Sequence, residues 1–400
     1  MIPVREARDR ILAALEATPA EWVGLERASG RVLALDAKAR RTQPPADLSA
    51  MDGYAVRARD TEGGEPLKLV GESAAGHGFS EAIRPGETVR IFTGAPLPEG
   101  ADAILIQEDA EAAGEIVHPK EAVTAGTYVR PAGLDFREGD DGMAAGQEIG
   151  PRNIGLLAAM NVPWVAVRRR PRIALLSTGD ELVRPGETPG PNQIISSNAL
   201  SVGALVEKAG GEAVDIGIAL DRPDALAEAG ARAAGCDMLV TLGGASVGDH
   251  DLVQDVLGGK GLDLDFWRIA MRPGKPLMFG RFGDIPLLGL PGNPVSALVC
   301  GVIFLRPAIR RMLGAEDLAP PLLRAALGRD LAANDRREDY LRSIAERGAD
   351  GRVTVTPFGK QDSSMLSVMS RANALTVRAP HAEAAARGDM VDYIALDHIA

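Results

Sequence analysis

The chain has 400 residues, which is enough for about two to four domains at roughly 150 residues each. Acidic residues outnumber basic ones by 55 to 44, so the chain offers no broad basic surface for DNA or RNA. Aromatic residues make up only 4%, which argues against platforms that stack nucleic-acid bases. We therefore expect a folded protein of several domains without a nucleic-acid partner.

The cysteines and the apolar segments predict a cytoplasmic protein without a membrane span. Cys236 and Cys300 lie far apart in apolar runs and outside any metal-binding pattern, as expected for free thiols in a reducing compartment. The start of the chain is charged and amphipathic and lacks the apolar core of a signal peptide. The longest apolar run, residues 295–305, is too short to cross a bilayer.

The first 170 residues predict a small domain that is interrupted by a second one. The spacing of apolar residues predicts a helix over residues 4–17, followed by extended segments over 21–41. Short strand-like runs between Gly and Pro turns follow at 67–71, 88–92 and 103–107. We expect residues 46–146 to form a β-rich insertion in an N-terminal linker domain made of 1–45 and 147–170.

From residue 171 the pattern changes to apolar strands that alternate with amphipathic helices. Strands are predicted at 172–177, 213–219, 238–242, 266–270, 276–279 and 285–288. Helices are predicted at 199–209, 223–234, 252–257 and 294–313. This alternation predicts parallel strand pairing in a three-layer α/β domain over 171–318. Short alternating strands predict a C-terminal β domain, a barrel or a sandwich, over 319–400.

A glycine-rich loop, TLGGASVGDHD, follows the predicted strand 238–242. Because ligands bind at the carboxyl ends of parallel strands, this loop lies at the expected functional edge of the sheet. Gly243, Gly244 and Gly248 would let backbone N–H groups approach an anion closely. Asp249 and Asp251 would place carboxylates beside that anion, which requires a divalent cation between them.

The same loop contains the G-x-S-x-G pattern of an α/β-hydrolase nucleophile, with Ser246 at its centre. The acids and histidines that would complete a triad, such as Asp335 and His381, fall in the predicted C-terminal domain. No oxyanion segment precedes the serine either. We therefore interpret Ser246 as part of a substrate-binding loop.

Polar side chains also follow two other strands of the predicted sheet. Thr178 and Glu181 come after the strand 172–177, and Asp221 comes after the strand 213–219. Parallel strands end at one edge of a sheet, so these acids should converge there with Asp251. Such a group of carboxylates is typical of a metal-assisted phosphate site.

A cationic segment follows in this otherwise acidic chain. Arg268 and Arg272 are four residues apart, so on a strand over 266–271 they would share one face, with the Arg272 guanidinium pointing into the crevice. Lys275 follows in a Pro-Gly turn. A rigid group of three cations suits an oxyanion or a phosphate.

The segment Gly289–Pro294 closes the α/β pattern and contributes Pro291 and Pro294 to the predicted substrate site. Pro294 stands at the start of the predicted helix 294–313, where a proline is well tolerated. Unpaired backbone N–H groups are expected beside it.

Motifs along the whole chain resemble the MoeA/gephyrin E-domain family, the enzymes that insert molybdenum into molybdopterin. The most specific of them is SAMDGYA at Ser49–Ala55. The other matching stretches are Ile91–Pro98, Arg130–Asp135, Leu176–Leu182, Gly243–Asp251, Arg272–Pro276 and Gly289–Pro294. One departure is that positions 268 and 272, usually lysine in the family, are arginine here, which keeps the charge but changes its geometry.

The resemblance implies an elongated homodimer of four-domain subunits. Its site would form between the α/β domain of one subunit and the β-rich domain of the other. The reaction would use adenylated molybdopterin, molybdate and Mg²⁺, and would release AMP and molybdenum cofactor. The catalytic residues implied by the motifs are Asp52, Thr93 and Asp135 on the β-rich side, and Glu181, Asp221 and Asp251 in the α/β crevice.

The resemblance further implies that Glu181 and Asp221 hold Mg²⁺, and that the C-terminal domain contributes Arg342 and Ser363. Two other functions remain open. A molybdopterin adenylyltransferase would share only the α/β part and would consume ATP without molybdate; such an enzyme is also a candidate partner. A non-enzymatic scaffold, as in the gephyrin relative, would use a peptide groove of the same architecture.

Overall fold

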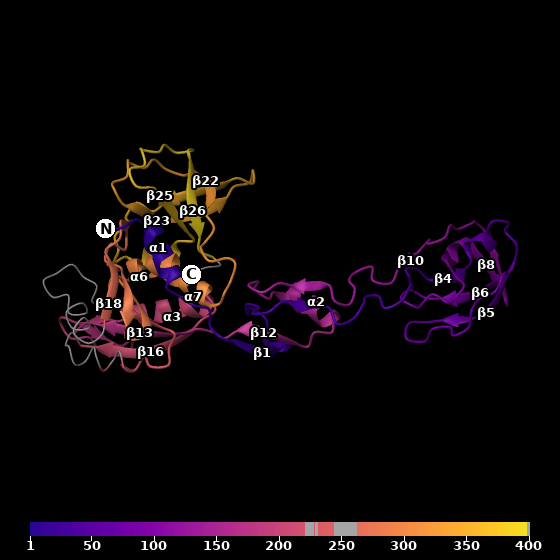
Figure 1. Cartoon of the computed structure of the whole chain (residues 1–400). Coiled ribbons are helices and arrows are strands. Elements are labelled where there is room, and N and C mark those ends of the chain that lie inside the picture. Colours follow the sequence, from indigo (N-terminus) through magenta and orange to yellow (C-terminus); the bar gives the residue numbers. More distant parts are fainter. Residues whose placement is uncertain (221–227, 229–230, 244–261, 398–400) are drawn as a thin grey trace.

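The computed structural model describes residues 1–220, 228, 231–243 and 262–397. The molecule is elongated: an α/β domain and a β-barrel lie together at one end, and an arm carries a β-rich domain at the other (Figure 1). The fold class predicted from the sequence, an α/β domain with flanking β-rich domains and a C-terminal barrel, is confirmed. Among the described residues, no helix is both long and apolar enough to cross a membrane.

The arm is built from two distant segments of the chain. Its two-stranded antiparallel sheet pairs β1 (Ala20–Gly24) with β12 (Trp164–Arg168), and helix α2 (Pro151–Ala159) lies nearby. Apolar side chains from both segments, including Leu33 and Ile149, share one buried core. Two short strand pairs lead outward: β2 (Ala37–Lys38) with β11 (Asp141–Met143), and β3 (Leu48–Ser49) with β10 (Val129–Arg130).

The β-rich domain at the far end of the arm is a six-stranded sheet of order β7-β4-β6-β5-β9-β8. Its strands are β4 (Gly53–Val56), β5 (Leu67–Ser73), β6 (Glu87–Ile91), β7 (Ala103–Ile106), β8 (Ala110–Ala113) and β9 (Ile116–Pro119). Single 3₁₀ turns occur at Leu25–Arg27 in the arm, and at Ala58–Thr61 and Gln107–Asp109 in this domain. The three strands predicted here are confirmed, with small shifts of their ends.

The α/β domain has a mixed six-stranded sheet of order β16-β13-β17-β21-β20-β18. Its strands are β13 (Arg172–Thr178), β16 (Glu212–Ala219), β17 (Met238–Leu242), β18 (Leu262–Trp267), β20 (Met278–Phe282) and β21 (Ile285–Leu290). The first four strands of that order pair in parallel. Strand β20 is antiparallel to β21, and β18 is antiparallel to β20. The predicted parallel pairing therefore holds for these four strands but not for β20 and β18. No helix separates β20 from β21, so the chain can turn back directly between these two strands.

Helices cover one face of this sheet. They are α3 (Asn198–Lys208) and a continuous run of α6 (Pro294–Cys300), a π-helical turn (Gly301–Leu305) and α7 (Arg306–Met312). On the opposite face, Ala174 and Leu239 pack with Ala233, which falls in the predicted helix 223–234. Most of that helix, and all of the one predicted at 252–257, lie outside the described residues.

The first helix packs differently from the sequence prediction. Helix α1 covers Val4–Ala13 and buries Val4, Ala7 and Ile11 in the core of the α/β domain, among residues of α7. The apolar stripe was correctly read as helical, but its partner is the α/β domain rather than the arm. The division of the chain into four domains at the predicted boundaries stays our proposal.

The C-terminal domain closes into a five-stranded barrel of order β23-β24-β22-β26-β25, with β25 pairing back to β23. Its elements are β22 (Leu323–Leu327), β23 (Glu338–Arg347), β24 (Val353–Pro357), α8 (Leu366–Arg371), β25 (Ala374–Arg378) and β26 (Met390–Ala395). A short strand of the α/β domain, β19 (Met271–Arg272), pairs in parallel with the first two residues of β23. The barrel is thus fixed to the α/β domain through shared strand pairing.

A charge network around the buried Arg310 joins the arm to the rest of the molecule. The side chain of Arg310 is only 6% exposed; it donates to Glu148 of the arm at 2.7 Å and also pairs with Asp317, which precedes the barrel. Arg306 donates to the Leu318 carbonyl at 3.0 Å. The network thus connects the arm with α7 and with the segment that precedes the barrel.

Candidate active site

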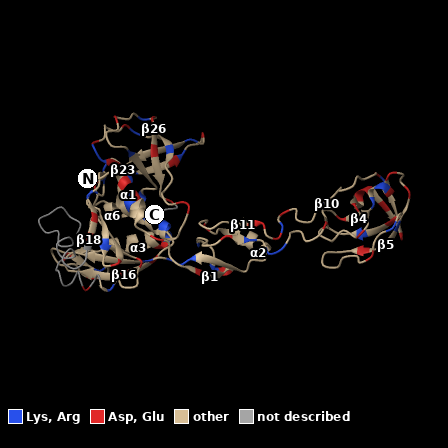
Figure 2. Ribbon diagram, viewed as in Figure 1, with Lys and Arg blue, Asp and Glu red and all other residues tan. Residues whose placement is uncertain are grey.

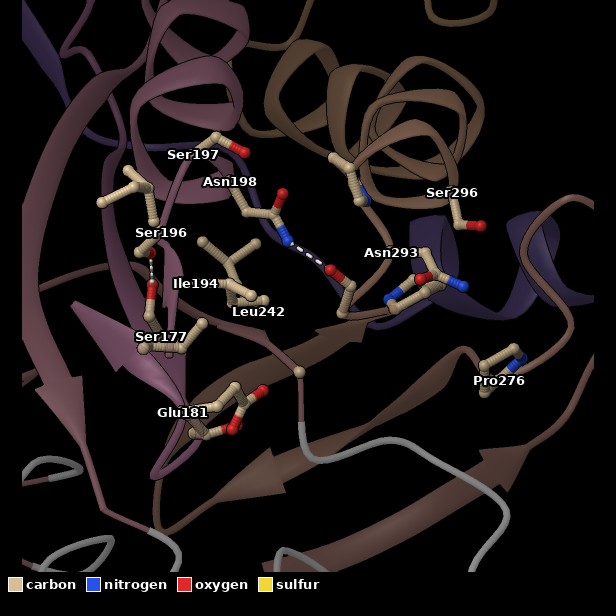
Figure 3. A pocket seen from close by; sticks show the side chains of 17 residues that line it. Ser177, Glu181, Ile194, Ser196, Ser197, Asn198, Leu242, Pro276, Asn293 and Ser296 are labelled. Carbon is tan, nitrogen blue, oxygen red and sulfur yellow. Dashed lines mark hydrogen bonds between the residues drawn. The ribbon is translucent and has the colours of Figure 1, made fainter. Parts of the chain in front are cut away.

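A pocket of about 480 Å³ opens at the carboxyl ends of β13, β17 and β21 (Figure 3). Hydroxyl and amide side chains form most of its polar wall: Ser177, Thr178, Ser196, Ser197, Asn198, Asn293 and Ser296. Leucine and isoleucine side chains form an apolar wall: Leu182, Ile194, Ile195 and Leu242. The short parallel pair β14 (Leu182–Val183) and β15 (Ile194–Ile195) supplies most of that apolar wall.

Five residues predicted from the sequence line this pocket, namely Thr178, Glu181, Gly243, Pro291 and Pro294. They come from three different strand ends, which meet at one edge of the sheet. The amide and serine side chains of the polar wall were not among the predicted site residues. Six further predicted residues, Asp221, Gly244, Ser246, Gly248, Asp249 and Asp251, lie outside the described residues.

Hydrogen bonds fix the polar wall. Asn198, at the start of α3, donates its side-chain amide to the Gly292 carbonyl at 2.7 Å. This contact ties the helix to the turn that precedes α6. The hydroxyls of Ser177 and Ser196 are 3.4 Å apart (Figure 3). The pocket therefore presents neutral donors and acceptors in set positions before any ligand enters.

Thr178 carries a buried hydroxyl that has no hydrogen-bond partner among the residues that the structure describes. The residue is only 4% exposed, yet it lines the pocket. A side chain at position 243 would come within 3.1 Å of this hydroxyl, and Gly243 has a φ of 110°, so glycine keeps this part of the pocket open. Buried hydroxyls are nearly always satisfied, which makes Thr178 a position for a ligand or a bound water.

Glu181 is the carboxylate of the pocket. Its backbone carbonyl accepts from the N–H of Ile194 at 2.8 Å, which fixes the turn after β13 against β15. Within the described part of the chain, no group of three or more His, Cys, Asp or Glu side chains is placed to hold a metal ion. Glu181 is a suitable oxygen ligand for Mg²⁺, because this ion commonly binds through one or two carboxylates plus substrate phosphates.

The barrel reaches the rim of the pocket through Ser363. The side-chain amide of Asn293 donates to the Ser363 hydroxyl at 3.1 Å, and the N–H of Val295 donates to the Ser363 carbonyl at 3.2 Å. Arg342, which is 1% exposed, donates to the neighbouring Asp362 carbonyl at 3.2 Å, while its Nε has no partner in the described part of the chain. Burial lowers the pKa of Arg342, partly offset by the Asp362 carboxylate.

The cationic segment differs from the prediction. Strand β18 ends at Trp267, and Arg268 has a φ of 76°, so the chain leaves the sheet there and the two arginines do not share a strand face. The Arg268 guanidinium stacks over the Trp267 ring at 4.0 Å. Arg272 points to the barrel instead of the crevice: its Nε donates to Asp339 at 2.7 Å and its Nη1 lies 3.5 Å from Asp335. The reason is that β19 belongs to the edge of the barrel sheet.

The residues predicted on the β-rich side lie at the other end of the molecule. Asp52 accepts hydrogen bonds from both the backbone N–H and the hydroxyl of Thr93, each at 2.8 Å. These bonds, backbone first, hold the pKa of Asp52 below its ordinary value, and Arg90 adds to the effect. Asp135 is exposed between β10 and β11. Within one chain, the β4 domain that carries Asp52 is far from the β13 end that carries the pocket (Figure 1).

We expect Thr93→Val to raise the pKa of Asp52 part of the way back to its ordinary value of 3.8, because the backbone hydrogen bond remains. Asp52 would then be protonated, and lose its contacts, at a higher pH as the solution is acidified. Carboxyl ¹³C NMR titration measures this directly. Thr124→Val removes a hydroxyl elsewhere in the same domain and should leave Asp52 unchanged. An Asp52 pKa that is identical in wild type and Thr93→Val would contradict the claim that the Thr93 hydroxyl helps to lower this pKa.

Comparisons with known proteins agree along the whole chain. Residues 2–161 match the "MoeA N-terminal region (domain I and II)", residues 174–311 a "probable molybdopterin binding domain", and residues 324–396 the "MoeA C-terminal region (domain IV)". A molybdopterin molybdenumtransferase of Haemophilus influenzae is 33% identical over 100% of both chains. The chain belongs to the MoeA family.

Other members of the MoeA family are similarly close. A molybdopterin molybdenumtransferase of Nostoc sp. is 37% identical over 80% of this chain and 76% of its own length. Molybdopterin molybdenumtransferase 2 of Mycobacterium tuberculosis is 36% identical over 88% of this chain and 89% of its own. Among solved structures, the molybdopterin biosynthesis MoeA protein from Pyrococcus horikosii aligns over 99% of both chains, with a TM-score of 0.87 and 28% identity.

Proposed function

We propose that the chain is a molybdopterin molybdenumtransferase, which inserts molybdate into adenylated molybdopterin with Mg²⁺-dependent release of AMP and yields molybdenum cofactor. The observation that carries this proposal is the polar pocket at the strand ends of the α/β domain. It falls within the stretch that matches a molybdopterin-binding domain, in a chain related from end to end to molybdopterin molybdenumtransferases.

The pocket suits a large neutral heterocycle joined to a charged group. Its amides and hydroxyls supply fixed donors and acceptors for a ring with several polar edges, and Thr178 supplies a buried hydroxyl that needs a partner. The side chains of Leu182 and Ile194 supply apolar surface for the flat faces of a ring. Exclusion of water by these walls would strengthen each polar contact.

For the phosphate part of the substrate, we propose the loop Gly243, Gly244, Ser246, Gly248 and Asp249 as a backbone cradle. Glu181 and Asp221 would hold Mg²⁺, which when bound supplies positive charge at the phosphoanhydride. Asp251 completes the proposed acids of the crevice. The Glu181 carboxylate, which lines the pocket just after β13, would orient this charge.

Molybdate and the remaining parts of the substrate are assigned to the rim. The proposed residues are Arg268, Lys275, Pro291, Pro294, Arg342 and Ser363. Support comes from the barrel contact at the pocket edge, where Ser363 meets Asn293. The Nε of buried Arg342, which has no hydrogen-bond partner among the described residues, supports it as well.

We further propose a cytoplasmic homodimer in which Asp52, Thr93 and Asp135 of one subunit act at the pocket of the other. The support is the separation of these residues from the pocket within one chain (Figure 1). A molybdopterin adenylyltransferase is the class of enzyme that would supply the adenylated substrate. No nucleic-acid partner is proposed.

The decisive experiment is an assay of AMP release. Purified protein with adenylated molybdopterin and Mg²⁺ should release AMP only when molybdate is added. Consumption of ATP with unmodified molybdopterin, without any need for molybdate, would identify an adenylyltransferase instead. Absence of both reactions would favour a scaffold.

A further inference from the structure

We propose that Arg90 is a positioning residue that fixes Asp52 in the geometry that the reaction needs. Its significance for catalysis rests on the proposed function, which assigns a catalytic role to Asp52. Asp52 lies in an exposed segment between β3 and β4, and Arg90 lies on β6 of the same domain. Arg90 was not among the site residues predicted from the sequence.

The strand register places the Arg90 side chain between two aromatic rings. Arg90 is directly opposite Tyr54 of β4, so both side chains project from the same face of the sheet. Phe92 comes two positions after Arg90, just beyond the end of β6. The Cζ atom of Arg90 is 5.1 Å from the centre of the Tyr54 ring and 5.0 Å from the centre of the Phe92 ring. Both rings can hold a planar guanidinium group by stacking, which an ammonium group cannot match.

Two hydrogen bonds fix the Arg90 guanidinium beside the main chain of Asp52. Its Nη1 donates to the Gly53 carbonyl at 3.1 Å, and its Nη2 donates to the side-chain oxygen of Gln107 at 2.9 Å. Gly53 follows Asp52 directly, and the backbone N–H of Gln107 donates to the Asp52 carbonyl at 3.2 Å. Arg90 thus binds both residues that hold the Asp52 main chain.

The same part of the chain also holds the Asp52 carboxylate. Thr93, which donates two hydrogen bonds to this carboxylate, comes three residues after Arg90. Arg90 therefore fixes the main chain of Asp52, while Thr93 fixes its side chain. A shift of Asp52 relative to β6 would break both sets of contacts at once.

The charge of Arg90 supports the same role. The Thr93 hydrogen bonds are the first cause of the lowered Asp52 pKa, and Arg90 is the charged group that adds to them. Both acidic and basic residues occur around β4 and β5 (Figure 2). A fixed cation beside Asp52 favours its ionised form despite the acids among these neighbours. The other ionisable groups on the surrounding elements are Tyr54, Glu72, Glu108, Lys120, Tyr128 and Arg130.

The pKa of Asp52 tests this geometry without the reaction. Arg90→Met removes the charge and both hydrogen bonds but keeps an unbranched side chain that fits between the rings, so the Asp52 pKa should rise. Arg90→Lys keeps the charge and should leave the pKa closer to that of the unmodified chain. Carboxyl ¹³C NMR titration measures both. The matched control is Arg59→Met, which removes a cation of the same domain whose side chain is 71% exposed, and it should leave the Asp52 pKa unchanged.

AMP release tests whether this positioning serves the reaction. Arg90→Met should lower kcat by on the order of tenfold or more, because a misplaced catalytic group loses rate steeply. The apparent KM for molybdate should stay nearly constant, since Arg90 acts through Asp52. Arg90→Lys should restore only part of kcat, because a single ammonium group cannot reproduce the fork that binds Gly53 and Gln107. Gln107→Met, at an exposed position where folding should be preserved, removes only the Nη2 acceptor and should lower kcat in the same direction by less.

Three results would overturn the inference and leave the proposed function standing. They are an unchanged Asp52 pKa in folded Arg90→Met, a wild-type kcat in that variant, and a lower unfolding temperature as the only effect of the substitution. Failure of the unmodified chain to release AMP in the presence of molybdate would instead refute the proposed function. The NMR titrations would still show whether Arg90 holds Asp52.

Discussion

A mixture of Glu181→Gln and Asp52→Asn chains should regain activity that neither variant has alone. Each substitution removes a charge at nearly constant volume, so folding should be preserved. Each should reduce molybdate-dependent AMP release by on the order of a hundredfold or more, as for loss of a group that stabilises developing charge. In a random mixture, half of the dimers contain one chain of each kind. Each mixed dimer has one site with both native acids, so the mixture should reach about a quarter of wild-type activity.

The recovery separates two arrangements of the site. If Asp52 and Glu181 of the same chain acted together, every chain in the mixture would carry a defective site, and no activity would return. The matched control mixes Glu181→Gln with Thr178→Val, two changes in the same pocket, and should show no recovery in either arrangement. AMP release is measured after the chains have been co-expressed or allowed to exchange. Lack of recovery in the first mixture, with exchange demonstrated by mass, would disprove the shared site.

Part of the pocket could be predicted, because ligands of parallel sheets bind at the carboxyl ends of the strands. Thr178, Glu181 and Gly243 follow strands whose apolar runs are plain in the sequence, and such strands end at one edge. Asn198 and Asn293 were missed for a physical reason. Their placement depends on partners far along the chain, the Gly292 carbonyl and the Ser363 hydroxyl, and no local pattern encodes those contacts.

Pairing between elements was the least predictable feature. The apolar stripe of α1 marks a helix, but nothing within it shows that the stripe packs into the α/β core. The period-two argument for Arg268 and Arg272 failed because it assumed that one strand continued past Trp267. The following two-residue strand β19 finds its partner in β23 of the barrel, a contact that propensity cannot indicate.

Arg272→Ala should destabilise the junction between the α/β domain and the barrel. Asp339 is 3% exposed and would lose its bidentate cation while staying buried. Loss of one partner of a buried pair costs about 3–5 kcal/mol, and because Arg272 itself is half exposed we expect about 2 kcal/mol. Asp335 would be affected less, since Arg337 donates to it at 2.6 Å. Calorimetry should show a lower unfolding temperature, and Arg272→Ala combined with Asp339→Asn should recover most of it.

The same pair of variants decides whether Arg272 also binds molybdate. A lost charge-assisted contact to the anion would cost roughly 1.5–3 kcal/mol, or about ten- to a hundredfold in apparent molybdate affinity. Asp339→Asn removes the unpaired buried negative charge but supplies no positive charge for molybdate. If Arg272 binds molybdate directly, the double variant should therefore regain stability while its molybdate binding stays weak. Arg272→Lys should then restore much of the affinity, because the charge returns without the planar fork. AMP release is measured against molybdate concentration for all three proteins. If the double variant regains both stability and molybdate affinity, Arg272 serves only to hold Asp339 and the barrel, and the anion must be bound by other cations of the rim such as Lys275 and Arg342.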